Sequence, residues 1–247
     1  GSDRYGFWFD LREHPEGPSA TTSICPIGEK LGEFTDNEAH SVGRYGLRIF
    51  HAHIPRKYPC YPYIYPNNPD PYSANPPIQA VYKNFLGWKN MRSAVIAEEI
   101  GAVKFTNILA ADNLRAGIEI SGGGRSPEGT FLVDGAWLVA TTENAGNLTE
   151  YQVKEVKGLI TPKANYFWGK NIYFLGYTGN MTAIETCSHC EHSSVSDSGG
   201  RTHYFAGLHF TDCEKKVRHN SVNSTILIDT DGSLTGYVGG STTYFYQ

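Results

Sequence analysis

The chain has 247 residues, a formal net charge of −4 and a hydrophobic content of 40%, which is enough for a folded core. No run or stripe of basic residues occurs, which argues against nucleic acid or an anionic membrane surface as the main partner. No apolar stretch approaches the roughly 20 residues of a membrane-spanning helix, and abundant Gly, Pro, Tyr and Phe favour short strands joined by many turns.

The first irregular region covers residues 58–79 and is dense in proline, tyrosine and asparagine. Repeated proline removes backbone donors and fixes an extended path, so the sequence predicts a long ordered loop here. The loop either covers apolar surface or presents tyrosine rings to a sugar. Cys25 and Cys60 flank it and could close it with a disulfide. His51 and His53 alternate on an expected strand, and we expect both to be surface or loop residues.

A helical period is plausible only around residues 79–87, where Val81, Tyr82 and Phe85 share one face of a helix. The sequence therefore predicts one short helix at this position. Elsewhere the pattern favours strands.

A degenerate repeat begins near residue 100. Each copy has an aromatic or apolar residue, a spacer pair that ends in Asn or Gly, and a second apolar cluster. These copies are 103–109, 132–139, 167–174 and 204–210. A second short strand follows in several copies, at 117–120, 183–185 and 226–228. Short β units that recur at a period of roughly 28 to 37 residues are typical of a solenoid, whose coils must stack to bury their apolar faces.

The repeat predicts an all-β solenoid in which inward side chains at matching positions form ladders. A β-sandwich is the competing interpretation, because its strands also recur at short intervals. Four matching corner positions favour the coil, since Asn and Gly tolerate the left-handed backbone that a bend needs. These positions are Asn107, Gly135, Asn171 and Gly207.

The period exceeds that of a minimal coil, so we expect long lateral loops at residues 141–157 and 187–201. We expect residues 1–247 to form a single β-helix domain with a Pro/Tyr-rich excursion at 58–79. This domain would be a segment of a larger extracellular protein.

The cysteines and the glycosylation sequons together favour a secreted or cell-surface origin. Because the number of cysteines is odd, at least one is free or pairs outside this segment. The disulfide candidates are Cys25, Cys60, Cys187, Cys190 and Cys213. The glycosylation candidates are Asn147, Asn180 and Asn223.

Several groups of residues keep the order that they have in a known family, along nearly the whole chain. They are Gly6–Phe9 with His14–Ser19, Leu31–Phe34 with Ala39–Ser41, Ala111–Gly117, Thr186–Cys190 and Asp229–Gly236. On these motifs the chain resembles the carboxy-terminal β-helix region of the fibrocystin and fibrocystin-like family. It is similar, more distantly, to hyaluronan-binding and hyaluronan-cleaving cell-surface proteins.

The resemblance implies a right-handed parallel β-helix in a large extracellular protein, often ciliary or on the cell surface. The glycine-rich amino-terminal domain and the immunoglobulin-like repeats of the family do not occur in this sequence, nor does a membrane anchor. Activities that depend on those parts are therefore not implied for this segment.

The densest group of metal-ligand side chains lies within a few residues of the motif Thr186–Cys190. Its members are Cys187, His189, Cys190 and His192. Their sulfur and imidazole donors suit zinc or copper, but a closed zinc site needs a second ligand pair, from Cys213, His203 or His209. A disulfide of Cys213 with Cys187 or Cys190 is the preferred alternative, and free thiols are the third.

A second candidate metal site is a turn in which Asp229, Asp231 and Ser233 alternate oxygen donors around Gly232, as at the start of a calcium loop. The acidic residue that completes an EF-hand does not follow. A turn held by aspartate side chains that bond backbone amides explains the same residues, and we prefer it. Calcium or zinc is therefore not expected to be required.

Glycosidase chemistry needs two carboxyl groups at a defined separation across one sugar bond. By position, the candidates are Asp112, Glu119, Asp134, Glu185 and Asp197. Glu119 and Glu185 follow equivalent strands, so they could stack on one face of the coil. No nucleophile elbow, phosphate loop or dinucleotide fingerprint occurs, and no catalytic residue is assigned.

These observations predict a non-catalytic, glycosylated extracellular module that acts as a scaffold or as a binding surface for glycans or proteins. A polysaccharide-processing enzyme acting on hyaluronan-like substrates is the alternative from another functional class. A third hypothesis is self-assembly, in which the exposed edges of terminal coils stack end to end into a filament.

Overall fold

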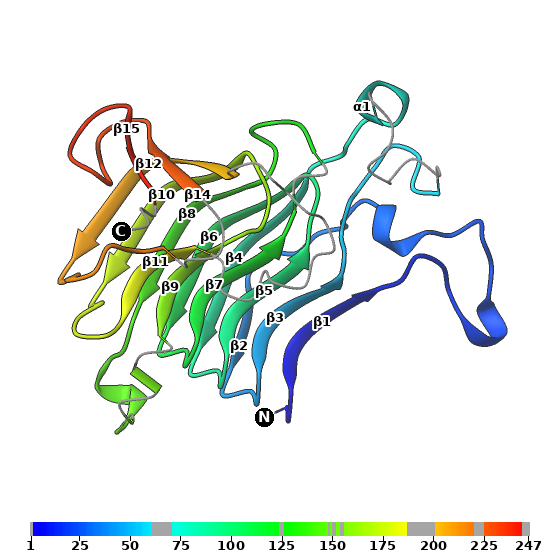
Figure 1. The fold of residues 1–247 in the computed structure, drawn as a ribbon. Helices are drawn as coiled ribbons and strands as arrows, with labels where there is room; N and C mark the ends of the chain where they lie inside the picture. Colours follow the sequence, from blue (N-terminus) through cyan, green and yellow to red (C-terminus); the bar gives the residue numbers. More distant parts are fainter. Residues whose placement is uncertain are drawn as a thin grey trace.

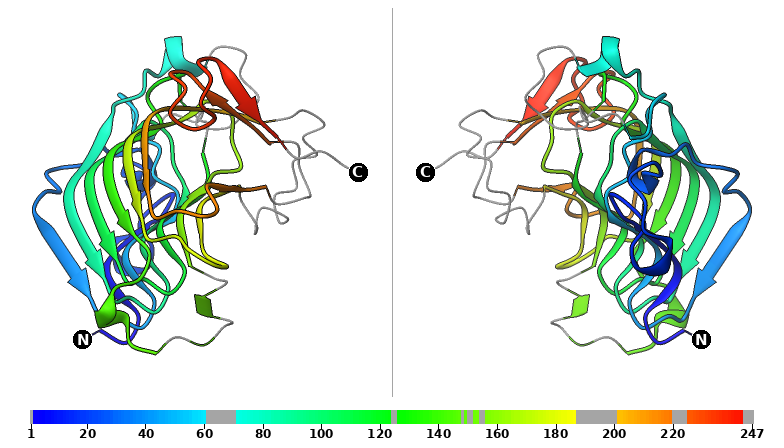
Figure 2. Two further views of the ribbon diagram at one scale, coloured as in Figure 1. Left: turned by 90° about the vertical axis from the view of Figure 1, so that its left-hand side faces the viewer. Right: turned by 90° about the vertical axis from the view of Figure 1, so that its right-hand side faces the viewer.

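The computed structural model describes residues 2–60, 71–123, 126–147, 149, 152–153, 156–186, 201–219 and 225–243. In this part of the chain the polypeptide winds into a parallel β-helix whose successive strands alternate between two sheets (Figure 1). Figure 2 looks along the coil and shows the strands of each sheet lying one behind another. The predicted solenoid is confirmed, and a sandwich of antiparallel sheets is not what these strands form.

The seven-stranded sheet takes one strand from each coil, and all of its neighbours are parallel. In spatial order its strands are β1 (Tyr5–Leu11), β3 (Tyr45–His51), β5 (Ser93–Glu99), β7 (Ala116–Gly122), β9 (Lys157–Thr161), β11 (Thr182–Thr186) and β13 (Val217–Arg218).

The eight-stranded sheet forms the opposite wall of the coil, and it is parallel except at its last strand. Its strands are β2 (Asn37–His40), β4 (Ala80–Trp88), β6 (Val103–Ala111), β8 (Leu132–Val139), β10 (Phe167–Leu175), β12 (Arg201–Thr211), β14 (Thr225–Asp229) and β15 (Gly240–Thr242). Strand β15 runs antiparallel to β14 and covers the edge of this sheet, whereas the outer edge of β1 has no strand partner in the described part of the chain.

Helical structure is minor among the described residues. One α-helix, α1 (Pro71–Ala74), lies inside the Pro/Tyr-rich excursion, and the single-turn 3₁₀ helices are η1 (Gly17–Ser19), η2 (Pro26–Gly28) and η4 (Glu143–Ala145). None of these helices has the length and apolar character needed to cross a membrane. The expectation of at most one short α-helix is confirmed, but its position was predicted wrongly.

The predicted helix over residues 79–87 is instead strand β4, and the error has a clear cause. Tyr82 and Phe85 are both fully buried in the coil although they are three residues apart. Asn84 between them has a positive φ of 51°, which adds one outward residue and resets the strand alternation. The resulting three-residue spacing of inward side chains imitates a helical period.

The same left-handed position recurs on every neighbouring strand of the eight-stranded sheet. Asn107, Gly135, Asn171 and Gly207 have φ values of 52°, 85°, 52° and 64°. The pairing of flanking residues places these four and Asn84 side by side across β4, β6, β8, β10 and β12. The predicted role of Asn and Gly in this register is confirmed.

Gly207 offers a test of this register. A Cβ atom there would lie 2.6 Å from the side-chain oxygen of Asn171, whereas Gly179 has a similar φ of 61° and no heavy atom within 4 Å of its Cβ position. Both substitutions by alanine carry the left-handed backbone penalty of about 1–2 kcal/mol. We expect Gly207→Ala to lower the free energy of unfolding by about 1 kcal/mol more than Gly179→Ala, because only the first is overpacked.

Urea denaturation of the two variants measures this difference. Equal losses of stability would contradict the side-by-side placement of Gly207 and Asn171.

Aromatic side chains fill much of the interior in ladders from coil to coil. Phe105 lies 5.5 Å from Tyr82 by ring centroids, and Phe174 stacks on Phe210 at 5.1 Å. Phe167 contacts Phe131 edge to face at 5.3 Å. These side chains lie between the two sheets, and each coil covers the aromatic rings of its neighbours. The stacking of successive coils therefore removes the rings from water.

All three expected second strands are strands in the structure. Residues 117–120 and 183–185 lie in β7 and β11 of the seven-stranded sheet, whereas residues 226–228 lie in β14 of the eight-stranded sheet. The strand that follows β12 in the seven-stranded sheet is the two-residue strand β13, which the sequence did not predict. The strand β13 is too short to produce a recognisable sequence pattern.

Cys25 and Cys60 form a disulfide that joins segments 35 residues apart, with their Cα atoms 5.1 Å apart. Cys213 is a half-buried free thiol whose sulfur donates to the carbonyl oxygen of Phe174 at 3.4 Å. The preferred disulfide of Cys213 with Cys187 or Cys190 does not form in this structure, because Cys213 is free. Cys187 and Cys190 themselves lie outside the described residues. The assignment of residues 1–247 to a single domain stays a prediction.

Candidate ligand-binding groove

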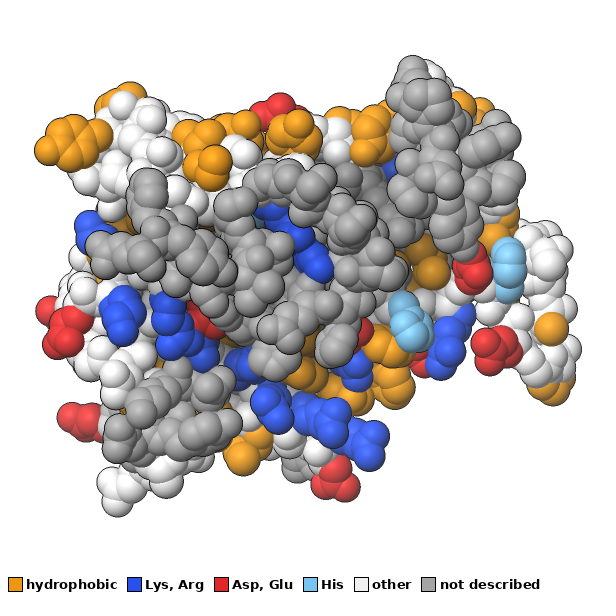
Figure 3. Space-filling view, in the orientation of Figure 1, with side chains coloured by type: hydrophobic (Ala, Val, Ile, Leu, Met, Phe, Trp, Pro, Cys, Tyr) orange, Lys and Arg blue, Asp and Glu red, His pale blue; other side chains and the backbone are white. Residues whose placement is uncertain are grey.

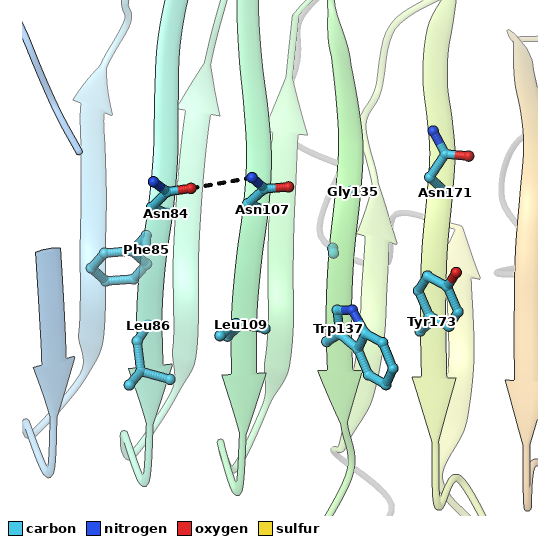
Figure 4. A pocket seen from close by; sticks show the side chains of 10 residues that line it. Asn84, Phe85, Leu86, Asn107, Leu109, Gly135, Trp137, Asn171 and Tyr173 are labelled. Carbon is cyan, nitrogen blue, oxygen red and sulfur yellow. Dashed lines mark hydrogen bonds between the residues drawn. The ribbon is translucent and has the colours of Figure 1, made fainter. Parts of the chain in front are cut away.

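An open groove of about 470 Å³ runs across the outer face of the eight-stranded sheet (Figure 4). It crosses four consecutive strands, β4, β6, β8 and β10, so it follows the axis of the coil rather than a single strand. One flank is a row of large apolar or aromatic side chains, and the other is a row of asparagines. Both rows exist because the strands stack in register.

The apolar row contains one outward side chain per coil. Its members in order are Leu86, Leu109, Trp137, Tyr173 and His209. The rings of Trp137 and Tyr173 are 4.4 Å apart and nearly parallel at 6°, and those of Tyr173 and His209 are 4.3 Å apart at 8°. Leu109 and Trp137 are 46% and 47% exposed and lie directly opposite each other on β6 and β8, so they form a contiguous exposed apolar patch.

The asparagine row lies two residues earlier on the same strands, at the left-handed positions. The Asn107 side-chain NH₂ donates to the Asn84 oxygen at 3.2 Å, and the Asn171 NH₂ donates to Asp134 at 2.9 Å. Gly135 interrupts the row, so the Asn107 oxygen faces a glycine instead of another amide. Among the described residues, nothing donates to the side-chain oxygens of Asn107 and Asn171.

The residues that line the groove are all uncharged. Beside it, Lys104 and Asp134 form an ion pair at 2.6 Å. Partial burial raises the pKa of Asp134, but the hydrogen bonds from Lys104 and Asn171 outweigh it and the pKa is lowered. Figure 3 shows the opposite side of the molecule, that of the seven-stranded sheet, where Lys and Arg side chains gather on the lower half.

The two carboxylates expected to stack, Glu119 and Glu185, do share a register: both pair with Ile160 of the intervening strand β9. Two strand spacings separate them, about 10 Å. Each is buried and engaged by arginine. Arg115 binds both oxygens of Glu119 at 2.8 Å, and Arg218 forms an ion pair with Glu185. Neither is placed at an open surface where a sugar bond could enter.

The remaining carboxylate candidates also have structural partners. Asp112 is buried and accepts hydrogen bonds from the hydroxyl, at 2.8 Å, and the backbone N–H of Thr142. Asp134 belongs to the ion pair beside the groove. Asp197 lies outside the described residues. The four candidates that the structure describes are therefore not brought together into one accessible pair.

The turn at Asp229 is held by side-chain to backbone hydrogen bonds. The buried Asp229 carboxylate accepts from the backbone N–H groups of Gly232, Leu234 and Thr235, and from the Thr235 hydroxyl at 2.8 Å. Asp231 accepts from Ser233, and this bond lowers the pKa of Asp231. These contacts describe a turn of the kind that the sequence predicted.

The candidate metal ligands Cys187, His189, Cys190 and His192 lie outside the described residues. Among the residues that the structure does describe, no group of three or more His, Cys, Asp or Glu side chains converges on one point. His203 and His209 lie on β12 but point to opposite faces, since His203 is fully buried and His209 is exposed. They cannot serve together as a second ligand pair.

His51 and His53 were expected to be surface or loop residues, and His53 lies in the loop after β3 but is not at the surface. Its side chain is 2% exposed. The contacts fit a neutral imidazole whose Nε2–H donates to the Glu29 carbonyl at 3.1 Å and whose Nδ1 accepts from the Tyr82 hydroxyl at 3.0 Å. The chain turns inward after His51, which remains exposed at the end of β3. Alternation along a strand could not reveal this turn.

Burial lowers the pKa of His53 and of His203 from 6.5 to about 4. Both imidazoles are therefore neutral in the fold, while the unfolded chain takes up protons below pH 6.5. This contribution to stability is complete above pH 6.5 and is lost as the pH falls toward 4. Between pH 7.5 and pH 5, the free energy of unfolding should therefore fall by about 2 kcal/mol for each of the two histidines.

Urea denaturation at pH 5 and pH 7.5 measures the effect. His203→Leu should remove about half of the pH dependence, because one of the two buried imidazoles is gone. A wild-type stability that is equal at both pH values would contradict the neutral, buried state of these side chains.

Two of the candidate sequons can be placed, and both are at the corner that follows the eight-stranded sheet. Asn147 lies between β8 and β9, and Asn180 between β10 and β11; both are exposed. Asn223 lies outside the described residues.

Sequence reasoning did not identify the groove residues as a site. In the sequence, Trp137, Tyr173 and Leu109 were noted only as aromatic or apolar residues of the repeat. The sequence does contain a signal for them, because each lies two residues after the Asn or Gly with a positive φ. If that Asn or Gly is counted as an extra outward residue, the second residue after it also faces outward, and the groove residues can be predicted.

Comparison with known proteins shows distant homologues. No family model matches the chain. The chain is 26% identical to fibrocystin-L of Mus musculus over 246 residues and 26% identical to fibrocystin-L of Homo sapiens over 249 residues, with 97% of this chain covered in each case. It is 27% identical to fibrocystin of Mus musculus over 210 residues, which cover 85% of this chain.

The aligned region is a small part of those proteins: 5% of fibrocystin-L and 4% of fibrocystin. The chain is thus distantly homologous to a fibrocystin-like region of a large protein, as the sequence motifs indicated. Together with the Cys25–Cys60 disulfide, this homology indicates an extracellular domain.

Proposed function

We propose that this chain is a non-catalytic, glycosylated β-helix module of a cell-surface protein, and that it binds an extracellular ligand at the axial groove. The exposed pair Leu109 and Trp137 carries the proposal. Large apolar side chains that a fold leaves exposed in a groove beside polar groups are typical of a binding surface. The partner is a glycan or an extracellular protein.

The arrangement of the carboxylates supports a binding role rather than hydrolysis. Glycosidases hold two carboxyl groups about 5–10 Å apart on either side of an accessible bond. Glu119 and Glu185 are buried in arginine ion pairs, and the groove itself has no carboxylate in its lining. A hyaluronidase-like enzyme therefore remains the alternative with less support.

The module is proposed to work without a cofactor and to carry N-glycans at Asn147, Asn180 and Asn223. The Asp229 carboxylate is already occupied by backbone N–H groups, which supports a structural turn over a calcium site. Zinc at the Cys187–His192 segment is not required by this proposal.

Self-association is a second candidate because β1 offers a seven-residue edge with no strand partner among the described residues. At the far end of the coil, β15 covers the edge of the eight-stranded sheet, and the seven-stranded sheet ends on the two-residue strand β13. Pairing of two β1 edges into a dimer is therefore better supported than stacking of β1 on β13 into a filament. Sedimentation velocity over a concentration series distinguishes a monomer, a dimer and longer assemblies.

Two measurements test the main proposal. After incubation with hyaluronan, the polymer should keep its length; shortened polymer would overturn the non-catalytic assignment. On an array of neutral glycans, acidic glycans and recombinant extracellular ectodomains, the wild-type chain should bind at least one probe. Leu109→Glu, which places a charge on the exposed floor of the groove, should abolish that binding, and retention would overturn the groove as the site.

A further inference from the structure

We propose that the groove binds a neutral glycan, and that one pyranose ring of the glycan lies over Leu109 against the open face of Trp137. This inference rests on the proposed binding function of the groove and names its ligand class. It follows from the stack of rings, the row of amides and the lack of charge.

The ring stack ends at Trp137 although the row of side chains continues. One face of the indole is covered by Tyr173, at 4.4 Å. The other face looks toward β6, where the matching position holds Leu109. A tryptophan side chain extends further from the sheet than a leucine, so the outer part of this indole face stands above Leu109. A ring that lay over Leu109 would continue the stack by one coil.

A pyranose suits this position chemically. The face of an aromatic ring is electron-rich and attracts the weakly positive C–H groups of a sugar face. The hydroxyls on the sugar rim can both donate and accept, as amide side chains do. The side-chain oxygen of Asn107 accepts no hydrogen bond from the described residues and lies beside the hollow at Gly135. The Asn171 oxygen is also without a donor among these residues but faces Gly207 at the next strand.

The charge around the groove favours a neutral ligand over an acidic one. No charged side chain lines it. The nearest cations lie beside the lining rather than in it: Lys104 pairs with Asp134 at 2.6 Å, Lys170 lies over the Trp168 ring, and Lys83 is exposed on β4. Recognition of a carboxylate or sulfate would call for a cationic fork or point charge in contact with the ligand. Acidic polysaccharides should therefore bind less well than neutral ones.

The spacing of the rows disfavours an extended peptide. Matching groups of the groove recur once per strand, about every 4.8 Å, whereas side chains on one face of an extended peptide recur about every 6.7 Å. The outer face of the sheet also presents side chains rather than free backbone groups, so strand addition is not available there.

Titration with neutral oligosaccharides, namely cellohexaose, mannohexaose, galactohexaose and xylohexaose, tests the inference. Isothermal titration calorimetry measures affinity without relying on the fluorescence of Trp137, and saturation-transfer NMR identifies the sugar protons in contact. At least one of these sugars should bind, with saturation at ring C–H protons. Trp137→Ala should weaken binding tenfold or more, by a loss of about 1.4 kcal/mol.

Trp8 is the matched control, because it is 49% exposed against 47% for Trp137 but lies on β1 of the other sheet. Trp8→Ala should leave binding unchanged. Leu109→Tyr is the second variant: the new ring would continue the stack on Trp137 and occupy the ligand position. It should fold with at least wild-type stability and lose binding.

The outcomes separate this inference from the broader proposal. Equal weakening by Trp137→Ala and Trp8→Ala, or binding only to heparin or hyaluronan oligosaccharides, would overturn the neutral-glycan inference and leave a binding role intact. Binding to a protein ectodomain and to no glycan would likewise overturn the neutral-glycan inference and leave a binding role intact. Binding of no probe, neutral, acidic or protein, would overturn both.

Discussion

Glu119→Ala is expected to lower the free energy of unfolding by about 3–5 kcal/mol. The Arg115 and Glu119 side chains are 9% and 6% exposed, and Arg115 contacts both carboxylate oxygens at 2.8 Å. Ser93 donates a third hydrogen bond to the same carboxylate at 2.9 Å. Removal of the carboxylate takes away the buried ion pair and leaves the hydrogen-bond donors of Arg115 and Ser93 without this acceptor, which is the expensive part of breaking a buried ion pair.

Asp10→Ala is the control, since the Arg12–Asp10 pair has side chains 47% and 31% exposed. Its loss should change stability by less than about 1 kcal/mol. The double variant Arg115→Met/Glu119→Leu should recover most of the stability lost in Glu119→Ala, because both charges are replaced by apolar groups. Urea denaturation measures all three variants. A small effect of Glu119→Ala would contradict the buried pairing and reopen a catalytic role for this carboxylate.

Phe105→Ala is expected to cost about 3–5 kcal/mol, the second large effect. The Phe105 ring is fully buried and stacks within 5.5 Å of Tyr82 in the next coil, so its removal leaves a cavity between two coils. Leu109→Ala on the same strand should cost less than about 1 kcal/mol, because this side chain is 46% exposed in the groove.

The pair of variants reports directly on which side of β6 each residue faces. Asn107, between them, adds the outward residue that puts Phe105 inside and Leu109 outside. Comparable losses at the two positions would show that the alternation is not reset at Asn107. Thermal denaturation suffices for this comparison, since the expected difference exceeds its usual error.

The coil could be predicted from the sequence because Asn and Gly recur at one structural position. Asn107, Gly135, Asn171 and Gly207 report a backbone requirement, positive φ, that few residues satisfy. The first two coils lack such clear copies, and the three-residue spacing of Tyr82 and Phe85 imitated a helix. Strand β13 has only two residues, too few for any pattern.

The candidate site was less predictable, for a different physical reason. The exposed aromatic surface was sought in the tyrosines of residues 58–79, whereas the groove is formed by Leu109, Trp137 and Tyr173. These residues come from separate coils and meet only through strand register, which a linear pattern does not contain. Carboxylates such as Glu119 were considered as catalytic groups by type, but their arginine partners could not be recognised before the coil was known.

Stacking of successive coils in register is tested most directly by a distance across several coils. Leu86 on β4 and His209 on β12 are the two ends of the row of outward side chains along the groove. Three strands, β6, β8 and β10, lie between β4 and β12. Spin labels at cysteines placed there, with Cys187, Cys190 and Cys213 replaced by serine, should give one narrow distance distribution by double electron–electron resonance. Four strand spacings predict a backbone separation of about 19 Å. A distribution well outside the range that label length allows around this value, or two separate populations, would contradict the in-register coil.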